Sequence, residues 1–241
     1  FYEKSLSILS KNLNEYHNKQ YTENYWRILI GPWLASFYFI LFERYYALKN
    51  CFDEFEIDKI NMLNFKNMKE FIPNEMFDYV RFQQDDLWNQ SIYQELIQVF
   101  FSKEKKISLT DYNETWNIKN KSDKNIISNF IKFFFNKVPI NKFYNYLVTA
   151  TYMGMVNELK LSMKLGQFPI FYKRQKLPQL IKVDESARKK ISKNNFTKGD
   201  IQDIFFQIVS NKIPKYFLEG FTNLVQKTKK LNYPKDPKII F

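Results

Sequence analysis

The chain opens with apolar residues at helical spacing. Between Ser5 and His17 they recur every three or four positions, which is typical of an amphipathic helix with one buried face. The residues of this face are Leu6, Leu9, Leu13 and Tyr16. The pattern predicts that the first element is a helix packed against a core.

A long apolar run follows. The fifteen residues from Ile28 to Phe42 include no charged side chain. A membrane span needs about 20 such residues, and Gly31 and Pro32 lie near the start of the run. Proline is accepted in the first turn of a helix, where its missing N–H costs little. We therefore predict a short piece before Gly31 and a buried central helix from Pro32 to about Lys49, rather than a membrane span.

Later segments have less regular patterns. We predict helices at 86–102, at 123–136 after the N-cap Ser122, after the near capping box of Thr197 and Asp200, and from Pro214 onward. Residues 50–75 have no clean period, which predicts a loop with short helices. Residues 103–121 and 172–195 are polar and rich in lysine, so we expect exposed connections there.

The period changes between Tyr146 and Tyr152, a short run rich in β-formers that predicts a buried strand. The run leads through Gly154 into a helical segment that Gly166 can end. Residues 239–241 again resemble a strand, and we expect residues beyond them to complete its sheet. These patterns predict a helix-rich α/β fold. We expect a helical region at 1–121 and an α/β region at 122–241.

Charge is distributed unevenly along the 241 residues. Residues 1–100 carry net −4 and residues 101–241 net +16, for a total of +12. One hypothesis is therefore a non-enzymatic basic module that binds nucleic acid or an anionic membrane surface through residues 101–241. A lysine- and asparagine-rich composition from an AT-rich genome explains the same excess. Five arginines against 32 lysines disfavour a dedicated nucleic-acid reader, because arginine makes the best phosphate and guanine contacts.

Several kinds of site are excluded by composition. Cys51 and His17 are the single cysteine and histidine, so a disulfide framework and a Cys/His zinc site are ruled out. The five glycines are too far apart for a phosphate-binding loop. The sequence has no Asp-x-Asp element, and the acidic residues between Asp53 and Asp58 have the pattern of a solvated surface.

Several blocks of the sequence resemble one known family, the transferases of bacterial O-antigen and capsule biosynthesis clusters, in their N-terminal region. The most specific block is Tyr25-Trp26-Arg27-Ile28-Leu29-Ile30-Gly31-Pro32-Trp33-Leu34. Weaker matches lie before and after it, at Asn14-Glu15-Tyr16-His17, Phe42-Glu43-Arg44-Tyr45, Asp86-Leu87-Trp88-Asn89, Thr151-Tyr152-Met153, Leu165-Gly166-Gln167-Phe168-Pro169 and Tyr233-Pro234 with Pro237-Lys238-Ile239-Ile240-Phe241.

This resemblance implies the acceptor-side portion of a GT-B-like glycosyltransferase, cytoplasmic or peripheral on the inner membrane. A further C-terminal domain with a His-Gly-Gly sequence is expected to supply most of the nucleotide-sugar site, and the chain without it is expected to be inactive. The implied substrates are a nucleotide-sugar and a glycan or lipid-linked acceptor. No cofactor is implied, and the missing Asp-x-Asp element favours a metal-independent reaction.

Two residues are candidates for catalysis. His17 has a side chain that titrates near neutral pH and can act as a general base, although a capping or surface role is the alternative. Glu158 follows the predicted strand at 146–152, where α/β sheets bind ligands. Its alternative role is that of a first-turn acid that complements the helix dipole.

Four residues are candidates for substrate binding. Arg27 can clamp a phosphate or pair with Glu43, and Arg44 can bind substrate or act as a cation at the end of the long helix. Tyr152 and Gln167 are expected to face the cleft between the domains. Three tryptophans are expected to be core anchors rather than sugar platforms: Trp26, Trp33 and Trp88.

Overall fold

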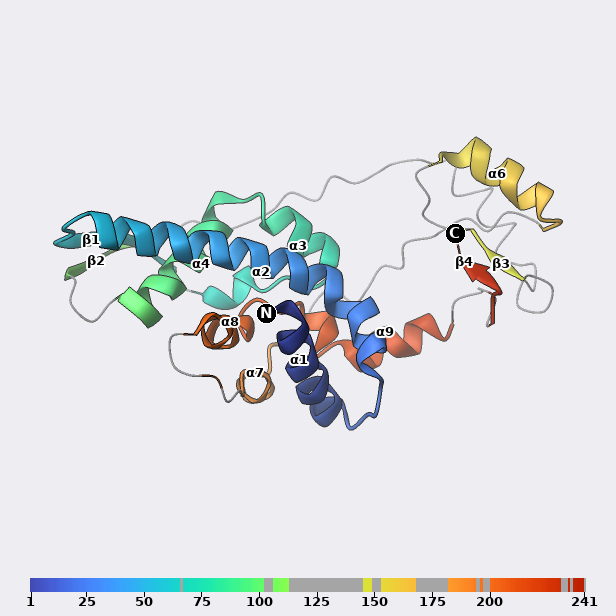
Figure 1. The fold of residues 1–241 in the computed structure, drawn as a ribbon, viewed down its shortest axis with the longest axis horizontal. Coiled ribbons are helices and arrows are strands. Elements are labelled where there is room, and N and C mark those ends of the chain that lie inside the picture. Colours follow the sequence, from blue (N-terminus) through green and yellow to red (C-terminus); the bar gives the residue numbers. More distant parts are fainter. Residues whose placement is uncertain are drawn as a thin grey trace. The chain divides into compact units, whose positions relative to one another are not determined.

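A computed structural model describes most of the chain (Figure 1). The described residues are 1–65, 67–101, 106–112, 145–148, 153–167, 182–193, 196, 200–230, 234 and 236–240. The chain divides into two compact units, the first formed by Phe1–Ile118 and Leu180–Thr222, the second by Lys119–Gln179 and Asn223–Phe241. Residues 180–222 thus belong with the N-terminal segment, although they fall within the α/β region expected at 122–241.

The first helix, α1 (Tyr2–His17), confirms the amphipathic pattern. Leu6, Leu9 and Leu13 are fully buried. The helix ends where Asn18 takes a left-handed conformation with φ of 49°. Thr22 then caps the next helix by accepting a hydrogen bond from the backbone N–H of Tyr25 at 3.2 Å.

The second helix, α2 (Glu23–Glu54), is continuous over 32 residues, so the prediction that a helix begins at Pro32 is wrong. A proline inside a helix costs about 3 kcal/mol. Burial of Trp26 and Ile30 before the proline, and of Trp33 and Phe37 after it, offsets this cost, because each large apolar side chain contributes about 1.5–3 kcal/mol.

By length and composition alone α2 could cross a membrane, but half of its most apolar 18-residue window is buried inside the protein. The predicted burial of this helix is therefore confirmed for its inner face. Its partners include α1, where Ser5 Oγ lies 2.6 Å from Tyr38 Oη. The three tryptophans expected to be core anchors, Trp26, Trp33 and Trp88, are all fully buried.

Two segments expected to be loops contain strands. β1 (Lys59–Phe65) pairs in parallel with β2 (Lys106–Tyr112), in the register Lys59 with Lys106. The connection between them contains η1 (Met68–Phe71), α3 (Met76–Phe82), α4 (Asp86–Leu96) and the π-helical turn η2 (Ile97–Phe101). The helix predicted at 86–102 is confirmed over 86–101, as α4 followed by η2, and Ser102 lies outside the described residues. Parallel strands need such a crossover, and this partner far along the chain stabilises strands that have no clear period of their own.

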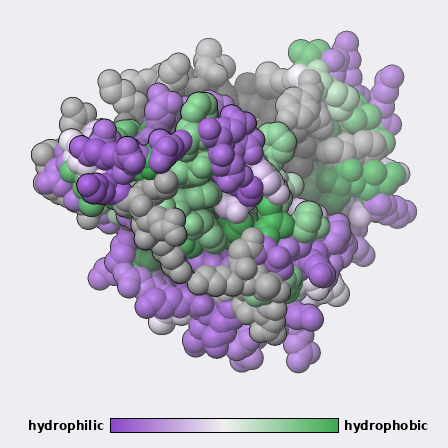
Figure 2. All heavy atoms as spheres, turned by 60° about the vertical axis from the view of Figure 1, so that its left-hand side comes forward, coloured by the Kyte–Doolittle hydropathy of each residue, from purple (hydrophilic) through white to green (hydrophobic). Residues whose placement is uncertain are grey.

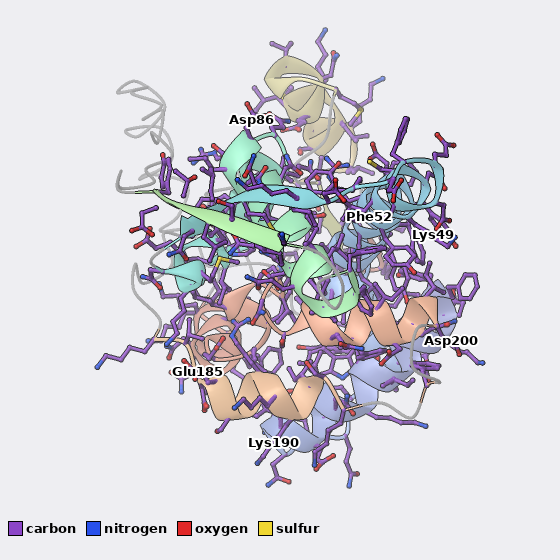
Figure 3. All side chains as sticks on the ribbon, turned by 90° about the vertical axis from the view of Figure 1, so that its left-hand side faces the viewer. Lys49, Phe52, Asp86, Glu185, Lys190 and Asp200 are labelled. Carbon is purple, nitrogen blue, oxygen red and sulfur yellow. The ribbon has the colours of Figure 1, made fainter. Side chains whose placement is uncertain are left out.

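The C-terminal part of the first unit is helical. It contains α7 (Glu185–Ile191), α8 (Ile201–Val209) and the 3-10 turn η5 (Lys215–Phe217), and α9 (Phe221–Thr228) begins there. The stretch 172–195 is therefore not an exposed loop throughout. Figure 3 shows Glu185 at the start of α7, Lys190 near its end, and Asp200 at the start of α8. Thr197 lies outside the described residues, and Pro214 precedes a 3-10 turn rather than a continuous helix.

Aromatic rings from distant segments form the core of this unit. Phe205 of α8 stacks on Tyr38 of α2 with ring centroids 4.4 Å apart, and it lies 6.0 Å from Phe37. Trp33 of α2 contacts Phe217 of η5 at 6.4 Å. The core thus holds α2 between the first and the last helices of the unit. On the face drawn in Figure 2, hydrophilic side chains surround areas of hydrophobic ones.

The second unit has a small parallel sheet of its own. β3 (Tyr146–Leu147) pairs with β4 (Ile239–Ile240), which confirms a strand at each place. The described strand β3 has two residues, and positions 149–152 of the predicted strand lie outside the described residues. The helix α6 (Met155–Lys164) comes after β3 in the chain. Gly166, two residues beyond the end of α6, has a φ of 70°, which confirms the helix stop predicted there. The predicted helix at 123–136 also lies outside the described residues. The described chain is helix-rich with small parallel sheets.

Candidate functional site

The turn between α1 and α2 is organised by one side chain. Asn14 Oδ1 accepts hydrogen bonds from the backbone N–H of Tyr21 at 3.1 Å and from Trp26 Nε1 at 3.0 Å. Asn14 Nδ2 donates to the carbonyl of Tyr21 at 2.8 Å. The two sequence blocks that contain Asn14 and Trp26 therefore form one structural unit around this turn.

His17 lies at the end of α1 beside this turn. Its Nε2 is 3.1 Å from the carbonyl oxygen of Phe217. A carbonyl only accepts hydrogen bonds, so Nε2 carries the proton in the neutral ring and Nδ1 is left as an acceptor. No partner of Nδ1 is recorded among the described residues. Three aromatic rings pack against the imidazole, with centroid-to-centroid distances of 4.3 Å for Phe221, 4.8 Å for Tyr16 and 5.9 Å for Trp26.

The electrostatic surroundings keep this imidazole neutral. Burial lowers the pKa of His17 below its usual 6.5, and the charge of Lys19 lowers it further, whereas the hydrogen bond to Phe217 acts in the opposite direction. A neutral imidazole with its Nδ1 lone pair available has the protonation state that a general base needs. The geometry therefore supports the predicted chemistry of His17 without testing it.

The two arginine candidates are held by ion pairs. Arg27 donates to both carboxylate oxygens of Glu3, at 2.8 and 2.6 Å, and to Glu23 at 3.0 Å. Its expected alternative partner Glu43 instead contacts Arg44 at 2.6 Å. The guanidinium of Arg27 is thus already occupied by carboxylates, which leaves less of it for a substrate phosphate.

Arg44 lies about 25 Å along α2 from Arg27, since an α-helix rises 1.5 Å per residue. It also donates to Asn89 Oδ1 at 3.0 Å. Because α2 continues for ten residues beyond Arg44, to Glu54, this arginine is not a cation at the helix end. The structure therefore does not bring Arg44 together with His17.

The remaining candidates belong to the second unit. Glu158 lies in the first turn of α6, the position of an acid that complements the helix dipole. Gln167 is buried and its Nε2 donates to the carbonyl of Tyr146 at 2.9 Å, which ties the end of α6 to β3. Tyr152 lies outside the described residues. The site roles of these three residues stay predictions.

A buried arginine that the sequence did not single out lies in the first unit. Arg188 of α7 donates from Nε and Nη2 to Glu219, at 2.7 and 2.8 Å, and from Nη1 to the carbonyls of Ser210 and Ile213, at 2.6 and 3.1 Å. The two side chains of the ion pair are 4% and 6% exposed. Removing one partner of such a pair costs about 3–5 kcal/mol. Arg188 thus fastens α7 to the segment that contacts His17.

A second buried pair joins α4 to the segment that follows α8. Lys212 Nζ lies 2.8 Å from Glu95 Oε1, and the two side chains are 1% and 10% exposed. Lys212 Nζ donates its hydrogen bond to Ser91 Oγ, 2.8 Å away. Glu95 Oε1 therefore has an ionic contact with Lys212 but accepts no hydrogen bond from the described residues. Glu95 Oε2 accepts from Asn211 Nδ2 at 3.0 Å.

A cavity of about 440 Å³ lies beside these two pairs. Its apolar walls include Met68, Ile72 and Val183, and its polar walls are formed by Lys69, Glu95, Gln98, Glu185, Arg188, Lys189, Ser210 and Asn211. This volume is within the range of small-molecule sites, about 300–1,000 Å³. No sequence pattern predicted this cavity, because its lining residues come from four separate segments.

Metal ligation has no support in the part of the chain that the structure describes, where no group of three or more His, Cys, Asp or Glu residues could hold a metal ion. Cys51 is exposed and free. The expectation of a metal-independent reaction stays a prediction.

Residues 1–241 match a family described as LIC12162 family transferase. No curated protein and no solved structure matches the chain. Because the match extends over the whole chain, the protein belongs to the LIC12162 family of transferases.

Proposed function

We propose that the protein is the acceptor-side portion of a GT-B-like glycosyltransferase, with His17 as its general base. The observation that carries this proposal is the hydrogen bond of Nε2 to Phe217, which fixes the tautomer with Nδ1 as acceptor. Membership in a transferase family supports group transfer as the reaction class. The sugar, the nucleotide donor and the role in surface polysaccharide synthesis are part of the proposal.

The reaction follows from the protonation state of His17. An acceptor hydroxyl gives its proton to Nδ1 while its oxygen forms a bond to the anomeric carbon of the donor sugar. The bond between that carbon and the nucleoside diphosphate breaks, and the diphosphate leaves with the electron pair. Arg27 is already paired with the carboxylates of Glu3 and Glu23. We therefore assign this arginine a structural role rather than the role of binding the leaving phosphate.

The cellular setting belongs to the same proposal. We propose a cytoplasmic protein, or one peripheral to the inner membrane, that acts on a glycan or lipid-linked acceptor. The net charge of +16 over residues 101–241 favours contact with an anionic membrane surface. The nucleotide-sugar site is assigned mainly to a further C-terminal domain.

The test is a transfer assay with the full-length protein. A panel of nucleotide-sugars is offered with glycan and lipid-linked acceptors, and product is detected by mass spectrometry. We expect turnover with at least one donor, its loss in His17→Ala, and nearly full activity in Arg27→Ala. Turnover that survives in His17→Ala would remove the histidine from the mechanism, and no turnover with any donor would contradict sugar transfer.

A further inference from the structure

The cavity beside the buried ion pairs has nearly balanced charge. Lys69 forms an ion pair with Glu185 at 2.5 Å. Arg188 is bound to the Glu219 carboxylate and donates to the carbonyls of Ser210 and Ile213. Lys189 is the one lining cation for which no ion pair is recorded among the described residues. A phosphate would meet this single available cation and the two lining carboxylates of Glu95 and Glu185. The charges therefore disfavour an anionic ligand.

The polar groups of the cavity suit hydroxyl groups instead. The Glu95 carboxylate lines the cavity and accepts one well-directed hydrogen bond, from Asn211. Oε1 is enclosed and faces Lys212 Nζ. Each carboxylate oxygen has about two acceptor sites, so Oε2 can accept from a ligand hydroxyl in addition to Asn211. Lys189 can donate to ligand hydroxyls, and the polar side chains of Gln98 and Ser210 line the same cavity. Donors and acceptors thus alternate around one space.

The walls are also fixed in position. Glu95 is held by Lys212 and Asn211, and Arg188 joins α7 to the segment after α8. The α4 helix, which carries Glu95, passes into the π-helical turn η2, which carries Gln98, and such turns occur frequently at functional sites. Met68, Ile72 and Val183 provide an apolar wall for the ring face of a ligand.

We propose that this cavity binds a neutral sugar, with a sugar hydroxyl that donates to the Glu95 carboxylate. A sugar ring has the required chemistry: many hydroxyl groups on its edges, no charge, and an apolar face. Identifying this sugar as part of the acceptor rests on the proposed function, whereas binding itself does not depend on the transfer reaction.

Methyl NMR on the full chain tests the site directly. Methyl groups of Met68, Ile72 and Val183 are labelled with ¹³C and titrated with glucose, galactose, N-acetylglucosamine and N-acetylgalactosamine. Glucuronate and inorganic phosphate serve as anionic probes. We expect saturable shifts of these methyl groups with at least one neutral sugar and weaker effects of both anions. No shift with any neutral sugar, or a larger response to phosphate, would overturn the proposal.

Variants locate the binding. Val183→Trp fills the cavity without removing a polar contact and should weaken the sugar Kd at least about tenfold. Val80→Trp makes the same change at an exposed position of α3 outside the cavity and should leave the Kd unchanged. Glu95→Gln should also weaken binding, and if that variant does not fold, Val183→Trp decides. An unchanged Kd in Val183→Trp would refute the site.

The two proposals fail separately. Sugar-dependent methyl shifts in a protein that transfers no sugar would support the cavity site and contradict the glycosyltransferase. Turnover by a protein whose cavity methyl groups respond to no neutral sugar would do the reverse.

Discussion

His17 Nε2 and the carbonyl oxygen of Phe217 lie 3.1 Å apart, although 200 positions separate the two residues along the chain. The contact joins the end of α1 to the end of η5. The contact orients the half-buried imidazole, burial keeps the ring neutral, and the centroid of the Phe221 ring lies 4.3 Å from that of the imidazole. A ring held in this way needs no reorganisation before it accepts a proton.

Replacement of the ring nitrogens should separate catalysis from packing. His17→Phe keeps an aromatic ring against Phe221 but has no proton acceptor, so kcat of the full-length protein should fall by about 10²–10⁴, the usual contribution of a general base. Loss of the hydrogen bond to Phe217 should cost about 1 kcal/mol in the free energy of unfolding. Steady-state kinetics and urea denaturation measure the two effects. An unchanged kcat would contradict the role of the histidine.

Stability should depend on His17 at mildly acidic pH. Its pKa is lowered in the folded protein, chiefly by burial, so below about pH 6.5 the unfolded chain binds this proton more readily. Its contribution to stability is therefore fully retained above that pH and lost as the pH falls toward the folded-state pKa. Urea denaturation at pH 7.5 and pH 5.5 should show a smaller acid-induced loss in His17→Phe than in the native sequence. Equal losses would mean that the folded-state pKa is not lowered.

The buried arginine should matter more for stability than the exposed one. Arg188→Met leaves the Glu219 carboxylate and two carbonyls without their donor, so the free energy of unfolding should fall by about 3–5 kcal/mol. Arg27→Met is the matched control, because its ion pairs with Glu3 and Glu23 are exposed and exposed pairs contribute little. Comparable losses in the two variants, measured by urea denaturation, would contradict this ranking.

The contact of Gly31 with Tyr2 should appear as coupling between two substitutions. A Cβ at Gly31 would lie 2.8 Å from Tyr2 Oη, so Gly31→Ala alone should be neutral or destabilising. In a Tyr2→Phe background, which lacks that hydroxyl, Gly31→Ala should stabilise by about 0.5–1 kcal/mol, the usual gain for replacing glycine within a helix. A double-mutant cycle by thermal denaturation measures the coupling. Additive effects would show that the ring moves aside freely.

Short-range patterns predicted the elements that depend on local sequence. The spacing of Leu6, Leu9 and Leu13 indicated α1, and Gly166 indicated where α6 ends. The break expected at Pro32 was wrong because local propensity was outweighed by burial on both sides of the proline. β1 and β2 were missed because each depends on a partner more than 40 residues away.

In the candidate site, too, local sequence indicated which residue to consider, whereas its contacts depend on residues far along the chain. His17 could be proposed from sequence because it is the single histidine, yet its tautomer depends on Phe217, which no spacing rule connects to it. Arg188 lies in a lysine-rich stretch that indicated an exposed loop. Its burial depends on Glu219, 31 residues later. One available signal was the residue type, since arginine is preferred over lysine for buried ion pairs.

The most direct test of the account is a ¹⁵N NMR spectrum of the imidazole, in which His17 gives the only histidine signals of the chain. Above neutral pH we predict a protonated Nε2 and an unprotonated Nδ1, and a titration midpoint below 6.5. A proton on Nδ1, or a midpoint above 6.5, would contradict the assignment of His17 as a neutral base held by Phe217.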